Sequence, residues 1–210
     1  MNKSNILCHR GLWQKKDDQN SLVSFKKAFE SGFGIETDVR DFGSNIVIAH
    51  DSPNHESSLF SDVLGQLISY KLKWKPFAIN IKADGLAGEI KKIIDEYKLI
   101  NYFTFDMSIP EMVCYKNAGL KYFSRLSEFE KPPVLLDDAA GIWLDAFGSE
   151  WYDEDYINNL KKNVKQVCVV SAELHSRDHT NQWALIKELK DHNNLMLCTD
   201  KPNEARKYFR

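Results

Sequence analysis

Cysteine is scarce in this sequence and has none of the spacings that make a cysteine site. Cys8, Cys114, Cys168 and Cys198 stand far apart without a Cys-x-x-Cys pair, and three of them lie within apolar runs. Closely paired cysteines mark zinc sites and redox motifs, and dense cysteines mark disulfide-stapled secreted domains. We therefore expect reduced cysteines in the protein core rather than zinc ligands or disulfides.

Long apolar runs and an excess of one charge are also missing. No segment approaches the roughly 18 apolar residues of a membrane span, and no apolar stretch before His9 has the length of a signal peptide. With 28 Lys and Arg against 30 Asp and Glu, the sequence has no basic stripe for nucleic acid. It also lacks a basic amphipathic stretch with clustered aromatics for stable membrane association. We expect a soluble, cytoplasmic protein.

No internal repeat, low-complexity tract or linker divides the 210 residues. A chain of this length is ample for one substantial core and sits at the lower end of the size range of eight-stranded α/β barrels. We expect one domain over residues 1–210. Strand-like and helix-like patterns alternate with short connections, which favours a parallel sheet.

The alternation predicts eight strands and seven helices. The strands are expected at residues 5–8, 34–39, 77–82, 102–106, 121–124, 141–146, 166–171 and 195–199. The helices are expected at 21–31, 59–70, 86–97, 109–118, 154–163, 181–191 and 202–209, with no helix between the fifth and sixth strands and a short extra strand at 46–49. We predict an α/β fold, a (β/α)8 TIM barrel with shortened connections; an open doubly wound sheet is the alternative.

Polar residues able to do chemistry follow the first strands. His9-Arg10-Gly11 closes one apolar run, Glu36-Thr37-Asp38 closes the next, and His50-Asp51 follows the extra strand. Sites in α/β proteins lie where parallel strands end, so these groups are expected in one cleft. Glu36 and Asp38 are two residues apart and share a strand face. Two such oxygen ligands suit Mg²⁺ or Ca²⁺, histidines suit acid/base work, and Arg10 suits phosphate.

The order of these groups resembles the start of a known family. The chain carries His9-Arg10-Gly11, Asn20-Ser21 with Phe25 and Ala28, Gly32 and Gly34, Glu36-Thr37-Asp38 and His50-Asp51. This is similar to the glycerophosphodiester phosphodiesterases, relatives of the barrel phospholipases, whose pattern reads HRG, N-(T/S)-x-x-x-F-x-x-A, Gly, E-x-D and HD. Later, Phe105-Asp106 and Thr199-Asp200-Lys201-Pro202 resemble the family's S-F-D and closing T-D-x-P segments.

The resemblance implies a barrel enzyme with a divalent cation, Mg²⁺ or Ca²⁺, and a small-molecule phosphodiester as its partner. It assigns His9 and His50 as the acid/base pair, Glu36 and Asp38 as metal ligands, and Arg10 as a phosphate contact.

The third strand departs from the family's E-x-K and reads Asn80-Ile81-Lys82. Lys82 keeps the phosphate contact. Asn80 replaces the third carboxylate, and we expect weaker metal binding from its neutral carbonyl.

Residues that follow the later strands are predicted to determine which substrate is bound. Where the family often has a W-T-V-N-like stretch, the chain has Ser171 to Arg177. We expect Asp145, Glu173, His175 and Arg177 to be substrate-binding candidates for the alcohol portion of the diester. The alternative for this segment is a solvated loop at a helix start.

The predicted function is metal-assisted hydrolysis of a soluble glycerophosphodiester, or of a polyol or sugar phosphodiester, to a phosphomonoester and an alcohol. Two alternatives remain open. One is a catalytically weakened barrel that binds phosphate esters, in which case Asn80→Glu restores activity. The other is a lyase-type enzyme that releases a cyclic phosphate. The sequence makes no prediction of oligomeric state.

Overall fold

Parallel strands alternate with helices along the chain, in a computed structural model that describes residues 5–72 and 74–210. The strands are β1 (Ile6–His9), β2 (Gly34–Phe42), β3 (Asn45–Ile48), β4 (Phe77–Ile81), β5 (Tyr102–Phe105), β6 (Phe123–Leu126), β7 (Gly141–Leu144), β8 (Val167–Val170) and β9 (Leu195–Thr199). The helices are α1 (Leu22–Glu30), α2 (Phe60–Ser69), α3 (Ala87–Tyr97), α4 (Ile109–Asn117), α5 (Glu154–Asn163), α6 (Thr180–Glu188) and α7 (Pro202–Tyr208).

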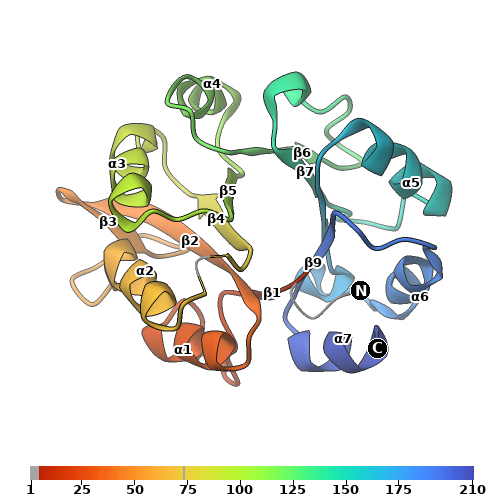
Figure 1. The fold of residues 1–210 in the computed structure, drawn as a ribbon, viewed down its shortest axis with the longest axis horizontal. Coiled ribbons are helices and arrows are strands. Elements are labelled where there is room, and N and C mark those ends of the chain that lie inside the picture. Colours follow the sequence, from red (N-terminus) through yellow and green to blue (C-terminus); the bar gives the residue numbers. More distant parts are fainter. Residues whose placement is uncertain (1–4, 73) are drawn as a thin grey trace.

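The strands form a nearly closed (β/α)8 barrel, which confirms the predicted fold class. Their order is β5-β4-β2-β1-β9-β8-β7-β6, with every neighbouring pair in this path parallel and β3 antiparallel to β2 at the side. The helices stand in a ring around the strands (Figure 1). Between β5 and β6 the described residues make only one isolated bridge, Thr104 with Tyr122. We call this interruption the seam.

Local sequence signals explain why the helices begin where they do. The Ser21 hydroxyl accepts the N–H of Ser24 at the start of α1, Ser108 accepts that of Glu111 in α4, and Asp153 accepts that of Tyr156 in α5. Such caps satisfy N–H groups that a helix leaves unpaired. The observed ends lie within three residues of the expected ones. The connection from β6 to β7 holds only a 3₁₀ turn, Leu136–Asp138, as the missing helical pattern predicted.

Two apolar layers make the core. The outer layer lies between the strands and the helices, and the inner layer fills the barrel with Leu7, Ala78, Phe103, Phe105, Phe123, Trp143, Cys168, Val170, Met196 and Cys198. Inside, Phe103 stacks on Phe123 with ring centres 3.7 Å apart, and Phe105 stacks on Trp143 at 3.9 Å. Aromatic rings therefore pack across the seam, where backbone pairing is nearly absent.

The cysteine prediction is correct for three of the four residues. Cys8, Cys168 and Cys198 are buried and free, as expected for core thiols. Burial raises the pKa of each of these thiols well above its usual value. Cys114 is free but exposed on α4, so placing it in the core was wrong. Its helix carries only a weak amphipathic pattern, and Met112 and Tyr115 supply the buried face instead.

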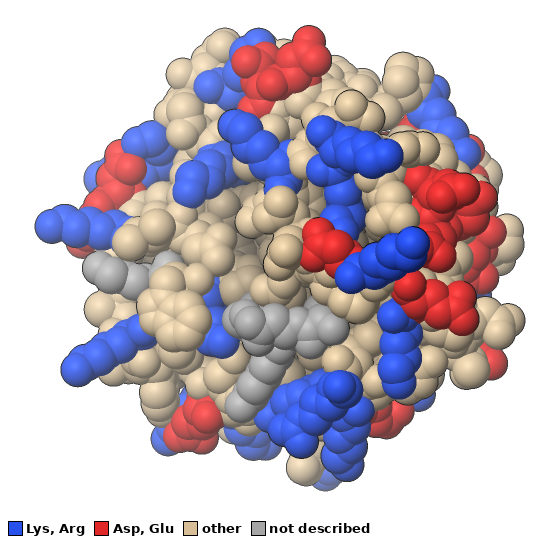
Figure 2. Space-filling view, turned by 45° about the vertical axis from the view of Figure 1, so that its right-hand side comes forward, with Lys and Arg blue, Asp and Glu red and all other residues tan. Residues whose placement is uncertain are grey.

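The surface carries charges of both signs. On the face drawn in Figure 2, Lys and Arg side chains are interspersed with Asp and Glu rather than gathered in a stripe of one sign. Among residues 5–72 and 74–210, no helix is long and apolar enough to cross a membrane.

Candidate active site

The turn after β1 explains the His9-Arg10-Gly11 motif. Arg10 has φ 55° and Gly11 has φ 89°, both in the left-handed region. A side chain at residue 11 would also collide with Ser24, so this position requires glycine. The Arg10 N–H donates to Oε2 of Glu36 at 3.1 Å, and its carbonyl accepts from the Asn20 N–H at 2.9 Å. The turn thereby joins the end of β1 to β2 and to the segment before α1.

Asn20 has a structural reason to follow this turn in the motif. Its side-chain Nδ2 donates to Oδ2 of Asp38 at 2.8 Å, while its Oδ1 accepts from the Thr37 hydroxyl at 3.0 Å. Its backbone is left-handed, with φ 55°, a conformation that asparagine tolerates better than most residues. Asn20 thus fixes the orientation of the Asp38 carboxylate.

His9 lies in a polar cluster at the barrel mouth. Its Nδ1 is 2.7 Å from Oδ1 of Asp200, and its Nε2 is 3.9 Å from Oε2 of Glu36. The parallel register of β1 with β9 pairs Cys8 with Thr199 and so places His9 beside Asp200. Burial opposes the charged imidazolium, but the hydrogen bond to Asp200 and the charge of Glu36 outweigh it, and the pKa of His9 is raised.

Glu36 is a buried acid that titrates near neutral pH. Burial, together with the nearby Asp38 carboxylate, raises the pKa of Glu36 from 4.5 to about 7. Its side chain is 1% exposed. A carboxyl with a pKa near 7 can gain and lose a proton in the pH range that acid/base chemistry requires.

Asp38 holds two cations at the mouth. Nε of Arg10 is 2.9 Å from its Oδ2, and Nζ of Lys82 is 3.3 Å from its Oδ1. Arg10 reaches it from the end of β1 and Lys82 from the end of β4, which pairs with β2 so that Asp38 faces Asn80. A buried carboxylate is stable only when it is paired in this way. The structure thus brings Arg10, Lys82, Glu36, Asp38 and His9 together.

The expected metal ligands lie side by side on β2 and β4. Asn80 Nδ2 donates to Oδ2 of Asp106 at 3.1 Å, whereas its Oδ1 is buried and accepts no hydrogen bond in the described chain. No group of three His, Cys, Asp or Glu side chains among residues 5–72 and 74–210 is placed to hold a metal ion. The available donors are therefore Glu36, Asp38 and the Asn80 carbonyl, a set of hard oxygens with two carboxylates.

His50 is held less firmly than His9. It follows β3, and the N–H of Ala49 donates to the carbonyl of Asp38, so the His50 loop starts beside the cluster. Nδ1 of His50 is 2.9 Å from Oδ1 of Asp51, but His50 is 43% exposed and Asp51 is 95% exposed. In the described chain no hydrogen bond or ion pair joins the His50 ring to His9.

Two of the expected substrate-binding residues form a second pair. Nε2 of His175 is 2.7 Å from Oδ1 of Asp145, which is buried at the end of β7. The His175 ring also lies 4.6 Å from the ring of Phe147, between centres. This pair follows β7 and β8, which lie on the other side of β1 and β9 from β2 and β4 in the strand order.

Glu173 and Arg177 are occupied by contacts within the protein. Glu173 accepts the hydroxyls of Ser171 and Thr199 and, at 3.1 Å, the N–H of Asp200. It therefore positions the residue that holds His9. Arg177 donates to the Ala146 carbonyl at 2.6 Å and pairs with Glu150. These contacts tie neighbouring loops together and leave neither charge free.

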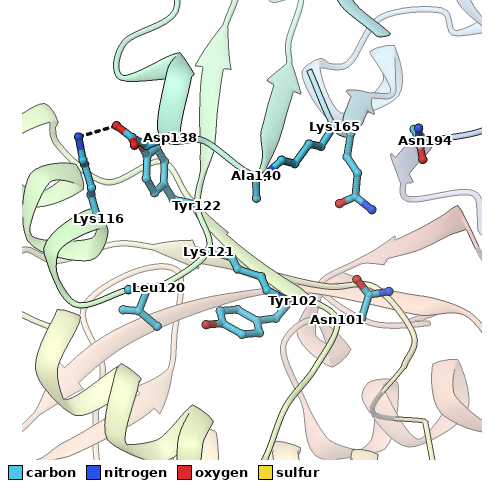
Figure 3. Close-up of a pocket in the computed structure, with 12 residues that line it drawn as sticks. Asn101, Tyr102, Lys116, Leu120, Lys121, Tyr122, Asp138, Ala140, Lys165 and Asn194 are labelled. Carbon is cyan, nitrogen blue, oxygen red and sulfur yellow. Dashed lines mark ion pairs between the residues drawn. The ribbon is translucent and has the colours of Figure 1, made fainter. Parts of the chain in front are cut away.

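A cavity of about 630 Å³ lies at the other end of the barrel. Residues that precede or begin strands line it, including Tyr102 and Lys121. Figure 3 shows the ion pair of Lys116 with Asp138 at its edge, with 2.5 Å between Nζ and Oδ2. This end of a barrel serves stability, whereas active sites lie at the carboxyl ends of the strands. Its size therefore does not make it the active site.

Similar proteins were found among solved structures. No protein-family model matches the sequence, and no curated protein does. A glycerophosphodiester phosphodiesterase from Agrobacterium tumefaciens superposes with a TM-score of 0.70 at 13% identity, over 97% of this chain and 99% of that one. One from Parabacteroides distasonis gives 0.66 at 16%, over 99% and 98%. The chain has the fold of these enzymes.

A weaker structural similarity extends to a phospholipase C. A Ca²⁺-dependent phosphatidylinositol-specific phospholipase C from Streptomyces antibioticus superposes with a TM-score of 0.55 at 11% identity, over 100% of this chain and 98% of that one. The family resemblance predicted from the sequence is thus confirmed at the level of the fold. Function on a barrel has to be argued from the site itself.

Asp200 and Asn20 had no site role in the sequence-based prediction, although both contact predicted site residues, as Asp106 does. Asp200 holds His9, Asn20 holds Asp38, and Asp106 holds Asn80. Each lies in a segment that resembles the family's motifs, and this resemblance was the only sequence feature that could have pointed to these residues. Their roles depend on contacts between residues 18 to 191 positions apart, which one sequence does not reveal.

Proposed function

We propose that the protein hydrolyses a phosphodiester, with a glycerophosphodiester or a polyol or sugar phosphodiester as substrate, to a phosphomonoester and an alcohol. One observation carries the proposal: a histidine held by Asp200 stands beside two cations that share Asp38. An acid/base group next to paired cations suits a reaction in which a phosphate ester is bound and a proton is moved. The fold shared with glycerophosphodiester phosphodiesterases supports the same reaction.

Phosphate binding falls to Arg10 and Lys82. Their side chains are 20% exposed and already converge on one carboxylate. A phosphodiester oxygen offers the same kind of acceptor as a carboxylate oxygen, so a bound substrate can exchange partners with Asp38. The guanidinium provides directed donors and the ammonium a compact charge.

Proton transfer falls to His9 and His50. As a hydroxyl of water or of the substrate itself attacks phosphorus, one imidazole takes its proton, and the other gives a proton to the departing alkoxide. Where the substrate's own hydroxyl attacks, water then opens the resulting cyclic phosphate to the phosphomonoester. His9 is prepared for the protonated role, because Asp200 and Glu36 favour its charged form. His50 then acts as the base from its loop beside Asp38. Loops of this kind often reach their working geometry only with substrate bound.

A divalent cation, Mg²⁺ or Ca²⁺, is expected on Glu36, Asp38 and Asn80. The buried Asn80 carbonyl oxygen that accepts no hydrogen bond supports this, as does the hard-oxygen chemistry of the three side chains. When bound, such an ion neutralises phosphate oxygens and stabilises charge that builds on them. Asp38, now paired with Arg10 and Lys82, would be free to hold the ion once these two side chains pair with the substrate phosphate.

Phosphorus NMR tests the proposal directly. Glycerophosphocholine, glycerophosphoethanolamine and a glycerol-phosphate polyol diester are each incubated with the protein in Mg²⁺ or Ca²⁺ and again after chelation. We expect a phosphomonoester signal that depends on the cation. The same spectra separate hydrolysis from release of a cyclic phosphate, which has its own resonance. Persistence of every diester in both conditions would reject the proposed hydrolysis for these substrates.

A second candidate function is binding without turnover. The observations that favour it are the neutral Asn80 in place of a third carboxylate and the prior pairing of Asp38 with two cations. Asn80→Glu separates the two candidates, with Asn80→Ala as its matched control. We expect calorimetric titration with Ca²⁺ to show tighter binding in Asn80→Glu. An enzyme active without the change supports hydrolysis, whereas activity gained only with it supports the binding module.

A further inference from the structure

A second cavity, of about 280 Å³, lies at the seam on the same end of the barrel as the polar cluster. It is bounded by the end of β5, the start of α4 and the connection that follows β6. We call it the seam cavity. Ligand pockets for whole small molecules begin at about 300 Å³. The seam cavity therefore has room for one substituent of a ligand rather than for all of it.

The seam cavity shares a wall with the proposed phosphate and metal site. Asp106, which lines the cavity, accepts from Nδ2 of Asn80 at 3.1 Å through Oδ2. Asn80 in turn faces Asp38 across the β2–β4 pair. A diester bound by Arg10 and Lys82 therefore lies beside the wall that Asn80 and Asp106 share with this cavity.

The polar residues of the seam cavity are already paired with one another. Arg125 donates to Oδ1 of Asp106 at 3.0 Å, and to Glu130 at 2.5 Å through Nε and 3.0 Å through Nη2. Ser124 donates its hydroxyl to the Val134 carbonyl at 2.7 Å. Lys131 turns away to lie 3.5 Å from the centre of the Trp151 ring. A polar or charged occupant would have to break these pairs.

Apolar side chains make up the rest of the lining. Met107 and Met112 are buried, while Ile109, Phe129 and Val134 are 55%, 77% and 36% exposed. Apolar surface gathered at the edge of a cavity marks a binding site more often than single exposed residues do. Methionine side chains adapt to ligands of different shape.

We propose that the seam cavity binds an apolar ester group of the phosphodiester, a hydrocarbon chain of the alkyl type. The inference rests on the proposed function and narrows its substrate class. Because the polar groups already engage one another, the occupant gains mainly from burial of its apolar surface. Phe129 covers the chain from the solvent side, and the two methionines contact it from within.

Calorimetric titration with alkyl phosphocholines tests this proposal. These are phosphodiesters in which one ester group is a plain chain, here from methyl to octyl at monomeric concentrations. We expect the Kd to fall about two- to fourfold for each methylene that enters the cavity, as apolar burial predicts. Phe129→Ser should flatten this dependence, whereas Ile100→Ser, at another apolar residue that is more than half exposed but lies away from the cavity, should leave it unchanged.

Three results would overturn the proposal: a Kd independent of chain length in the wild type, a dependence that Phe129→Ser leaves intact, or an equal loss in Ile100→Ser. Both changed residues are more than half exposed, so the variants are expected to fold. The readout is binding, and it therefore stands whether or not the protein hydrolyses the glycerol-based diesters.

Discussion

The barrel has two unlike sides, one closed by backbone pairing and one closed by side chains. From β4 through β2 and β1 to β9 the strands pair in unbroken parallel register. At the seam a single bridge remains among the described residues, and stacked rings of Phe103 and Phe123 complete the closure. The proposed catalytic groups all stand on the paired side. Hydrogen-bonded strand ends fix the spacing that polar chemistry needs.

The seam has less backbone pairing than the rest of the barrel, and cavities lie beside it. The 630 Å³ cavity and the seam cavity both adjoin it, one at each end of the barrel. On the cluster side, Arg125 spans the seam by joining Asp106 after β5 to Glu130 after β6. We infer a division of labour in which paired strands position the reacting phosphate and the seam accommodates the variable part of the substrate.

Loss of His9 should have the largest effect on catalysis. We expect His9→Ala to lower kcat by roughly two to four orders of magnitude, the contribution of a general acid or base, while the fold stays intact. Asp200→Asn should lower it less and shift the pH profile of kcat/KM, because it removes a charge that favours the protonated imidazole. The rates come from phosphorus NMR time courses.

The matched control lies away from both sites. Ile100→Ser changes an exposed apolar residue outside the polar cluster and the seam cavity, and it should leave the rate with glycerophosphocholine unchanged. If His9→Ala retained wild-type turnover, the assignment of chemistry to the paired side would be wrong.

The paired side was also the part most predictable from sequence. Its motifs are short and local, so the order of residues alone places Glu36 and Asp38 on one strand face and beside His9. The seam could not be foreseen in the same way. The sequence predicts a strand that begins at Lys121, but β6 begins only at Phe123. Whether β6 pairs with β5 depends on the curvature of the whole barrel. Roles that depend on contacts distant in sequence, such as that of Asp200, were missed for the same reason.

Loss of a seam aromatic should have the largest effect on stability. Phe123 is fully buried and stacks on Phe103, with ring planes 8° apart. We expect Phe123→Ala to lower the free energy of unfolding by about 3–5 kcal/mol, the usual cost of such a cavity. Urea denaturation followed by circular dichroism measures it. Phe123→Leu, which keeps most of the volume but removes the stacked ring, should lose less than the alanine variant. A leucine variant as stable as the wild type would mean that ring stacking does not close the seam.

The smallest predicted effect concerns the paired side, where Glu36 should make the free energy of unfolding depend on pH. The folded protein keeps this carboxyl protonated up to about pH 7, whereas the unfolded chain releases the proton near 4.5. The folded state thus binds more protons between these values. Stability should therefore fall as the pH rises through this window, by at most about 1.4 kcal/mol per pH unit for one group. Glu36→Gln should flatten that fall, and Glu89→Gln on the exposed face of α3 should not.

Urea unfolding at pH 5, 5.5, 6 and 6.5 measures this dependence while avoiding most of the His9 titration, which adds a fall in the same direction above 6.5. Burial also raises the pKa of Asp106 at the seam, so the wild-type slope alone mixes the two sides. The difference in this slope between wild type and Glu36→Gln gives the contribution of Glu36 on the paired side. The slope that remains in Glu36→Gln includes the contribution of Asp106 at the seam. Identical slopes in the two proteins would show that Glu36 is ionised in the folded state throughout, and that the cluster carries one more negative charge than we infer.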